Sequence, residues 1–177
     1  ENDKIFKPLK PTHQRYAEVF EKMGYPLDLE QFTFLGKQGI PEKVFSVLGE
    51  KKQNQWVGIA PFAAHAGKMY PLDMMVEVID TLNSRNDYQI LLFGGGEQEI
   101  TKLAAIAKTR NKVFSVAGEL TLAEELALIS NLDVMVAMDS GNAHLAANYG
   151  VPVVTIWGVT HPYSGFYPFG QPENHSL

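Results

Sequence analysis

From residue 56 onward, short apolar runs alternate along the chain with segments of helical periodicity. The apolar runs predict five strands, at residues 56–60, 89–93, 113–116, 133–138 and 153–157. These runs are continuously apolar, which is typical of strands that are buried on both faces of a sheet. Strands that alternate with helices in this way predict an α/β fold with a parallel sheet, flanking helices and right-handed crossovers.

Helical signals fill the intervals between these runs. Thr121 and Glu124 have the spacing of a capping box at the start of one helix. The last helix begins near Ser140 and stops at Gly150. The apolar stripes of two further helices are Leu72, Met75, Val76, Ile79 and Leu82, and Ile100, Leu103, Ala104 and Ala107. Helices thus connect consecutive strands, as a parallel sheet requires.

The first 55 residues lack this alternation and predict a short helical annex. One helix is expected between Thr12, its cap, and Gly24. A second helix has Pro41 in its first turn. The apolar residues of the first helix share one face: Tyr16, Val19, Phe20 and Met23. We therefore expect an annex at residues 1–55, followed by one sheet domain at residues 56–177.

Composition excludes several classes of protein. Apolar residues make up 45% of the 177 residues and charged residues 20%, which is typical of a globular domain. The net charge of −5 argues against nucleic-acid binding, and the absence of cysteine excludes disulfides and thiolate metal sites. No apolar run approaches the ~18 residues that a membrane span needs. Because the chain starts at Glu1, we expect that a native N-terminus is missing and leave a targeting signal open.

Ligands of open parallel sheets bind outside the carboxyl ends of the strands, so the loops there are the candidate site. After the second strand, the glycines 94–96 allow close backbone approach to a ligand, or a tight turn into the next helix. Glu97 and Glu99 suit ribose hydroxyls, or simply the positive end of that helix. Lys68, after the first strand, suits a diphosphate, whereas a lone loop lysine is usually just solvated.

The stretch "DSGNAH", after the fourth strand, carries a stronger signal. With Ser140 as the N-cap, the amides of Gly141, Asn142 and Ala143 are free donors that can bind phosphate. An inward Asp139 would repel phosphate, so we expect it to accept hydrogen bonds from ligand or loop hydroxyls and amides. His144 either donates to a phosphate oxygen or packs in the helix. From this stretch alone, a ligand seat and an ordinary capped helix remain open.

Other familiar chemistries are disfavoured. The loop after the first strand lacks G-x-G-x-x-G, and the chain has no P-loop motif and no H-E-x-x-H. The five histidines do not cluster, so we expect no metal held by the protein. Ser140 lacks the G-x-S-x-G elbow of a serine hydrolase.

Several ordered segments together resemble glycosyltransferase family 9, the heptosyltransferases that build the lipopolysaccharide inner core. They are "APFAAHAGKMYP", "LLFGGGEQE" and "VAGELTLAEELALISNLDVMVAMDSGNAHLAANYGVPVVTIWGVTHP". The resemblance implies a Rossmann-like domain, the C-terminal half of a GT-B enzyme, which binds a nucleotide-diphosphate sugar such as ADP-heptose. It also implies an inverting transfer without a protein-held metal or other cofactor, in the cytoplasm, with peripheral membrane association of the parent protein possible.

The resemblance also assigns residues. It places Lys68, Asp139 and His144 in catalysis, where Lys68 and His144 would stabilise the departing diphosphate. It implies that the donor sugar is bound by Lys68, Gly95, Gly96, Glu97, Glu99, Asp139, Ser140, Gly141, Asn142, His144 and Thr160, with His161 in the same loop as Thr160. Two departures stand out: Lys-x-Trp-Pro is here Lys68-Met69-Tyr70-Pro71, and the common Gly-Pro-Thr is Gly158-Val159-Thr160.

The domain that would bind a lipopolysaccharide-type acceptor and supply the general base has no counterpart in this sequence. We therefore expect a piece of a larger transferase that binds donor weakly and catalyses little alone. Two alternatives stay open: a nucleotide-binding module without catalysis, and another GT-B enzyme that uses UDP-sugars. The sequence does not decide the sugar, the acceptor, the oligomeric state, or which of Glu97 and Glu99 contacts the nucleoside.

Overall fold

The predicted parallel sheet is present in the computed structural model, which describes residues 7–49, 54–85 and 87–177. Its strands, in the order β3-β2-β1-β4-β5, are all paired in parallel. Their bounds differ from the predicted ones by no more than one residue at either end: β1 (Gln55–Ala60), β2 (Tyr88–Leu92), β3 (Val113–Ser115), β4 (Val134–Met138) and β5 (Val153–Ile156).

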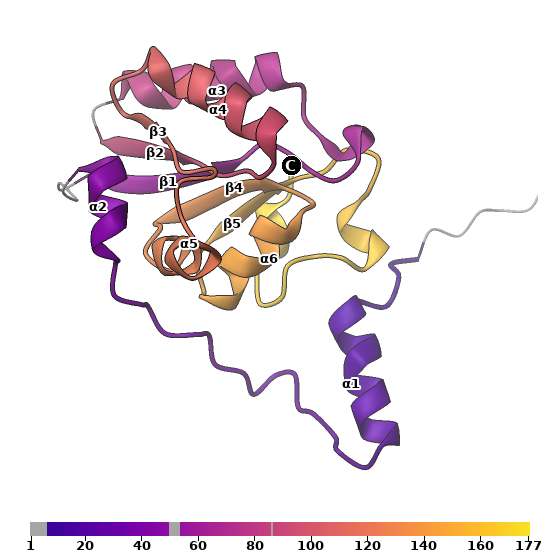
Figure 1. Ribbon diagram of the computed structural model, residues 1–177. Coiled ribbons are helices and arrows are strands. Elements are labelled where there is room, and N and C mark those ends of the chain that lie inside the picture. The colour runs from indigo at the N-terminus through magenta and orange to yellow at the C-terminus, as the bar shows by residue number, and fades with distance from the viewer. Residues whose placement is uncertain (1–6, 50–53, 86) are drawn as a thin grey trace, which may run out of the picture.

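Helices cover both faces of the sheet, which makes the domain a three-layer Rossmann-like fold (Figure 1). Helices α3 (Leu72–Ser84) and α4 (Glu97–Lys108) lie on one face. On the other face lie α5 (Leu122–Ile129) and α6 (Gly141–Asn148), together with α2 (Glu42–Leu48). The helix expected after the second strand thus begins directly behind the glycine loop, and the one expected near Ser140 begins at Gly141.

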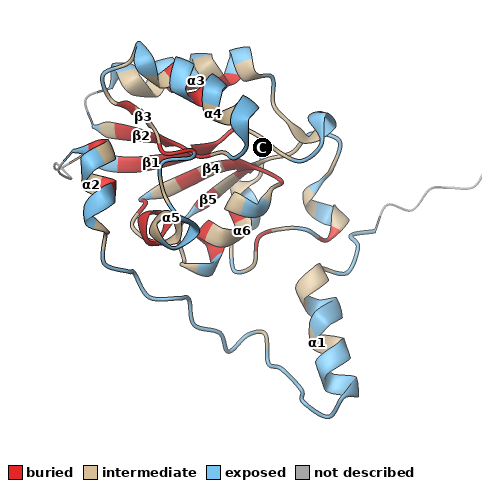
Figure 2. Ribbon diagram, viewed as in Figure 1, coloured by how far each residue is buried: buried red, intermediate tan, exposed pale blue. Residues whose placement is uncertain are grey.

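Each face of the sheet has its own hydrophobic cluster. In β1, Trp56 and Ala60 belong to the cluster that α2, α5 and α6 help to build. The alternate residues Val57 and Ile59 belong to the cluster under α3 and α4. Figure 2 shows the strands buried between the helical layers. Because successive side chains of a strand point to opposite faces, two covered faces explain why these runs are apolar at every position.

The two helices of the predicted annex differ in how they pack against the sheet. Residues 1–6 and 50–53 of the annex lie outside the described residues. Helix α1 (Thr12–Lys22) lies apart from the sheet and has no buried residue (Figure 1). In contrast, Val44 and Leu48 of α2 are buried in the sheet's core. The apolar residues predicted to share a face of α1 are all exposed: Tyr16, Val19, Phe20 and Met23.

Two predicted helix starts were wrong in detail. Thr12 does not cap α1, because Pro11 precedes it as the cap residue and the Thr12 hydroxyl donates to the Gly165 carbonyl at 2.9 Å. Pro41 likewise lies just before α2 and not in its first turn. By contrast, the capping box of α5 is confirmed, because the side chains of Thr121 and Glu124 each accept from the other's backbone amide. The Thr12 hydroxyl therefore bonds to Gly165, which is distant in sequence, and does not cap its own helix.

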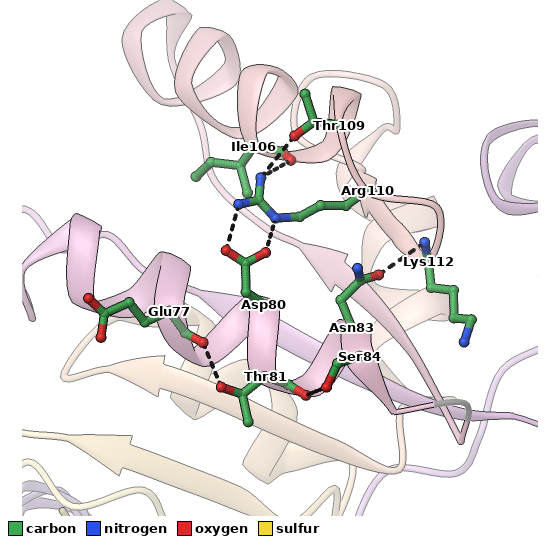
Figure 3. Close-up of polar contacts among 9 residues, drawn as sticks. All are labelled: Glu77, Asp80, Thr81, Asn83, Ser84, Ile106, Thr109, Arg110 and Lys112. Atoms are coloured by element: carbon green, nitrogen blue, oxygen red, sulfur yellow. Dashed lines mark hydrogen bonds and ion pairs between the residues drawn. The ribbon is translucent and has the colours of Figure 1, made fainter.

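A network of polar contacts joins the turn after α4 to α3 (Figure 3). The Arg110 guanidinium donates to both carboxylate oxygens of Asp80, at 2.5 and 2.9 Å, and also to the Ile106 carbonyl at 2.7 Å. The hydrogen bond from Arg110 lowers the pKa of Asp80. Because Asp80 is exposed, this pair orients the two helices more than it stabilises them.

We expect Trp56→Phe to lower the free energy of unfolding by about 1–3 kcal/mol, because a buried hydrogen bond is lost. The Trp56 indole donates to Gln89 Oε1 at 2.7 Å, and both side chains are buried. The double variant Trp56→Phe/Gln89→Leu removes both polar partners and should recover part of that loss. Urea denaturation of the three proteins measures this; a double variant less stable than Trp56→Phe would contradict it.

Candidate functional site

The strand order creates one point where the chain reverses its direction across the sheet. From β1 the chain proceeds to β2 and β3 on one side, whereas from β4 it proceeds to β5 on the other. The loops that follow the neighbouring strands β1 and β4 therefore diverge at their carboxyl ends. In open α/β sheets, the crevice at such a switch point is where ligands bind.

Lys68 and Asp139 meet at this switch point. Lys68 ends the short 3₁₀ helix Ala66–Lys68 in the loop after β1, and Asp139 follows β4 directly. The Lys68 ammonium donates to Asp139 Oδ2 at 2.7 Å. The partner of Asp139 in the structure is thus an ammonium, which the sequence analysis did not name, and its acceptance from ligand groups stays a prediction. The acid and the cation therefore act as one unit.

The two members of this pair differ in exposure. The Asp139 side chain is only 5% exposed, whereas that of Lys68 is 23% exposed. An ammonium has three donor hydrogens, and the contact with Asp139 takes one of them. A buried acceptor thus holds the ammonium in place while part of the lysine stays accessible to an anion.

The N-terminus of α6 begins immediately after Asp139. Ser140 occupies the predicted N-cap position in an extended conformation, with φ −148° and ψ 171°. The Ser140 hydroxyl makes no capping hydrogen bond; it is buried without a partner among the described residues. The amides of the first turn, including those of Gly141 and Asn142, have no carbonyl partner within an α-helix. Donors for an anion therefore lie beside the Lys68–Asp139 pair.

His144 occupies the next turn of α6 and is partly buried. Burial lowers the pKa of His144, and the Lys68 charge lowers it further, while the Asp139 carboxylate opposes the shift. At neutral pH the imidazole is therefore uncharged and offers one N–H donor. Both charges of the pair thus act on the His144 imidazole.

The glycine loop after β2 requires glycine at one position because of its backbone conformation. Gly96, just before α4, has φ +77°, a conformation that other residues rarely adopt. Glu99 turns back on this loop, and its carboxylate accepts from the Gly95 amide at 2.8 Å. Glu97 and Gly95 are exposed. The positive φ of Gly96 thus forms the turn into α4, and the bond from the Gly95 amide to Glu99 holds the loop.

The loop after β5 completes this edge of the sheet. The Thr160 hydroxyl is buried without a partner among the described residues, as the Ser140 hydroxyl is. His161 accepts a hydrogen bond from the Tyr163 amide at 3.3 Å through Nδ1, so it caps the following 3₁₀ helix Pro162–Ser164. Unpartnered buried hydroxyls are uncommon in proteins and usually mark a functional or solvated position.

Only some of the predicted site residues contact one another in the structure; others bond within their own loops. Lys68 and Asp139 are in contact, and His144 lies within their electrostatic reach. Glu99 bonds within its own loop, and His161 within its own turn. Sequence reasoning missed Phe166, whose ring centroid lies 5.9 Å from the Lys68 ammonium. No sequence motif marks such a contact, since Phe166 comes from a loop far along the chain.

Two further points concern residues 7–49, 54–85 and 87–177. No group of three or more histidine, aspartate or glutamate side chains there is arranged to hold a metal ion. No helix in the same ranges combines the length and the apolar character needed to cross a membrane.

Comparisons with known proteins agree with the fold. Lipopolysaccharide heptosyltransferase 3 of Escherichia coli K12 is 26% identical over 167 residues, which cover 89% of this chain and 48% of that protein. A glycosyl transferase family 9 structure from Veillonella parvula matches 95% of this chain and 48% of its own, with 20% identity and a TM-score of 0.75. The E. coli heptosyltransferase WaaC, solved with ADP, has 18% identity and a TM-score of 0.71 over 99% of this chain and 52% of its own.

The chain thus spans about half the length of these relatives. The two solved structures, at their low identity, establish the fold alone. The model of glycosyltransferase family 9 (heptosyltransferase) matches residues 2–174, which is nearly the whole chain. With this match over a Rossmann-like sheet that carries the expected loops in the expected order, the chain belongs to glycosyltransferase family 9.

Proposed function

We propose that the carboxyl edge of the sheet binds the nucleoside-diphosphate sugar donor of a heptosyltransferase-type reaction. The observation that carries this proposal is the Lys68–Asp139 pair, which lies at the switch point beside the N-terminus of α6. Cationic and amide donors converge there, in the place where such sheets bind their ligands. Family membership and the ADP complex of WaaC support a nucleoside diphosphate as the ligand.

In this proposal, the diphosphate lies between Lys68 and the first turn of α6. The amides of Gly141 and Asn142, together with the Ser140 hydroxyl, donate to phosphate oxygens, as helix N-termini commonly do. The free hydrogens of the Lys68 ammonium add a charge-assisted contact. Neutral His144 supplies a further N–H donor. Asp139 does not face the phosphates as an acceptor; it orients Lys68.

The same donors would assist the reaction itself. When the glycosidic bond to the diphosphate breaks, negative charge develops on the departing phosphate oxygens. Donors that already point at those oxygens stabilise the transition state more than the ground state. An acceptor hydroxyl would attack the sugar carbon from the opposite side and invert it, which requires a base for its proton. We assign that base and the lipopolysaccharide-type acceptor site to the region that relatives have beyond the matched half.

The nucleoside would extend toward the glycine loop after β2. Gly95 and Gly96 leave room for a close approach, because a Cβ atom at either position would meet no neighbour within 4 Å. Glu97 is exposed beside them and free to accept from ribose hydroxyls, while Glu99 holds the Gly95 amide. On the other side, Thr160 would donate its buried hydroxyl to the donor. We infer that the donor is ADP-heptose, which family membership and the ADP complex of WaaC support.

Lys68→Ala should weaken ADP binding by about 10- to 100-fold, because a charge-assisted contact to phosphate is lost. Isothermal titration calorimetry of this chain with ADP measures the change. Lys108→Ala, in the last turn of α4, is the matched control and should leave the affinity unchanged. Equal affinities of wild type and Lys68→Ala would place the donor elsewhere, and tighter binding of UDP than of ADP would favour a different sugar donor.

Burial of His144 makes the stability of the fold depend on pH. Because burial puts the pKa of His144 below 6.5 in the folded chain, the unfolded chain takes up a proton first as the pH falls. The contribution of His144 to stability is therefore complete above pH 6.5 and is lost as the pH falls through the pKa of the folded state.

We therefore expect the free energy of unfolding to fall less between mildly alkaline and mildly acidic pH in His144→Asn than in the wild type. Urea denaturation at both pH values measures this difference. His65→Asn is the control, because that side chain is exposed in the loop after β1. A wild-type pH dependence in His144→Asn would show that His144 is not held neutral by burial.

A further inference from the structure

The loop after β5 packs directly on the backbone of the turn that carries Lys68. A Cβ atom at Gly158 would lie 2.2 Å from the Gly67 carbonyl oxygen and 3.0 Å from Lys68 Cα. Both of these neighbours are backbone atoms, so neither can move aside without moving the turn. Position 158 therefore needs glycine for a close approach between two backbones.

The contact is reciprocal and includes a hydrogen bond. The Val159 amide donates to the Gly67 carbonyl at 2.9 Å. A Cβ atom at Gly67 would in turn lie 2.9 Å from Val159 Cγ1. We name this arrangement of Gly67, Gly158 and Val159 the backbone clasp. It joins two loops that follow different strands, β1 and β5.

Lys68 lies next to the clasp and depends on the same turn. Its own amide donates to the His65 carbonyl at 2.9 Å, and the Met69 amide donates to the Ala66 carbonyl at 3.1 Å. Its side chain then reaches Asp139 at 2.7 Å. A lysine side chain is flexible and loses considerable rotamer entropy when it binds a ligand. A turn that is fixed beforehand reduces this cost, because the ammonium already points to its position.

We propose that Val159 is a positioning residue for Lys68: its amide holds the Ala66–Lys68 turn, and so sets the affinity for the diphosphate. The inference rests on the proposed donor site and adds to it a residue that acts through its backbone amide. Proline lacks an amide hydrogen, so the bond to Gly67 exists only because position 159 is not proline.

The test compares Val159→Pro, which removes the donor, with Val159→Ala, which keeps it. Calorimetry with ADP should show about two- to tenfold weaker binding for Val159→Pro, the effect of one lost hydrogen bond. Val159→Ala should bind as the wild type does. In a Lys68→Ala background, Val159→Pro should have no further effect, because its action passes through Lys68. Equal additional losses in both backgrounds would overturn the proposal.

A second measurement works without a ligand and separates this inference from the donor site. Amide hydrogen exchange of Lys68 and Met69, followed by NMR, should be faster in Val159→Pro and unchanged in Val159→Ala. If wild type binds no ADP, the proposed function fails, and this exchange still decides whether the clasp holds the turn. Unchanged exchange in Val159→Pro would refute the clasp whatever ADP does.

Gly158→Ala provides an independent variant if Val159→Pro does not fold. Its Cβ atom would displace the Gly67 carbonyl, so exchange at Lys68 and Met69 should also rise. Gly39→Ala is the control glycine, because an added Cβ atom there meets nothing within 4 Å. Faster exchange in both glycine variants would mean a general loss of stability and would contradict a local role for the clasp.

Discussion

The pairing of β1 with β4 is the constraint on which the rest of this structure depends. These two strands are neighbours in space but lie far apart in sequence, and Ala60 and Ala137 stand opposite each other near their carboxyl ends. Their pairing brings the loop after β1 to the loop after β4, and only then can Lys68 reach Asp139. The burial of both faces stabilises this pairing, since each face has its own apolar cluster. The site therefore inherits its geometry from the sheet.

Much of the fold could be predicted because its signals are local. Continuous apolar runs marked the strands, and the Thr121–Glu124 capping box marked the start of α5, since both depend on residues close in sequence. The start of α1 could not be predicted as well, because the Thr12 hydroxyl binds Gly165, a residue on the opposite end of the chain. The local sequence favours Thr12 as the cap residue, but its hydroxyl is taken up by the bond to Gly165.

In the site, too, features that depend on nearby residues could be predicted, and those that depend on distant contacts could not. The loops that carry Lys68, Asp139 and Thr160 were predictable, because parallel strands place their carboxyl ends on one edge. The partner of Asp139 was not, because strand order decides which loops face each other and the chain does not state that order locally. Nor could burial of the Ser140 hydroxyl without a partner be read from its position as an N-cap. Residue types thus suggested the chemistry, whereas contacts between loops required the three-dimensional structure.

The backbone clasp has a consequence for how related sequences should be compared. Position 158 has no room for a Cβ atom, so we expect related sequences that keep the clasp to keep glycine there. Position 159 contributes its backbone amide to the clasp. Its side chain is exposed, so we expect many residue types to be tolerated there. A substitution to or from proline at this position removes or adds the amide hydrogen of the clasp. Substitution scores count it as one change like any other. Two homologues with equal identity to this chain can therefore differ in the rigidity of their lysine turn.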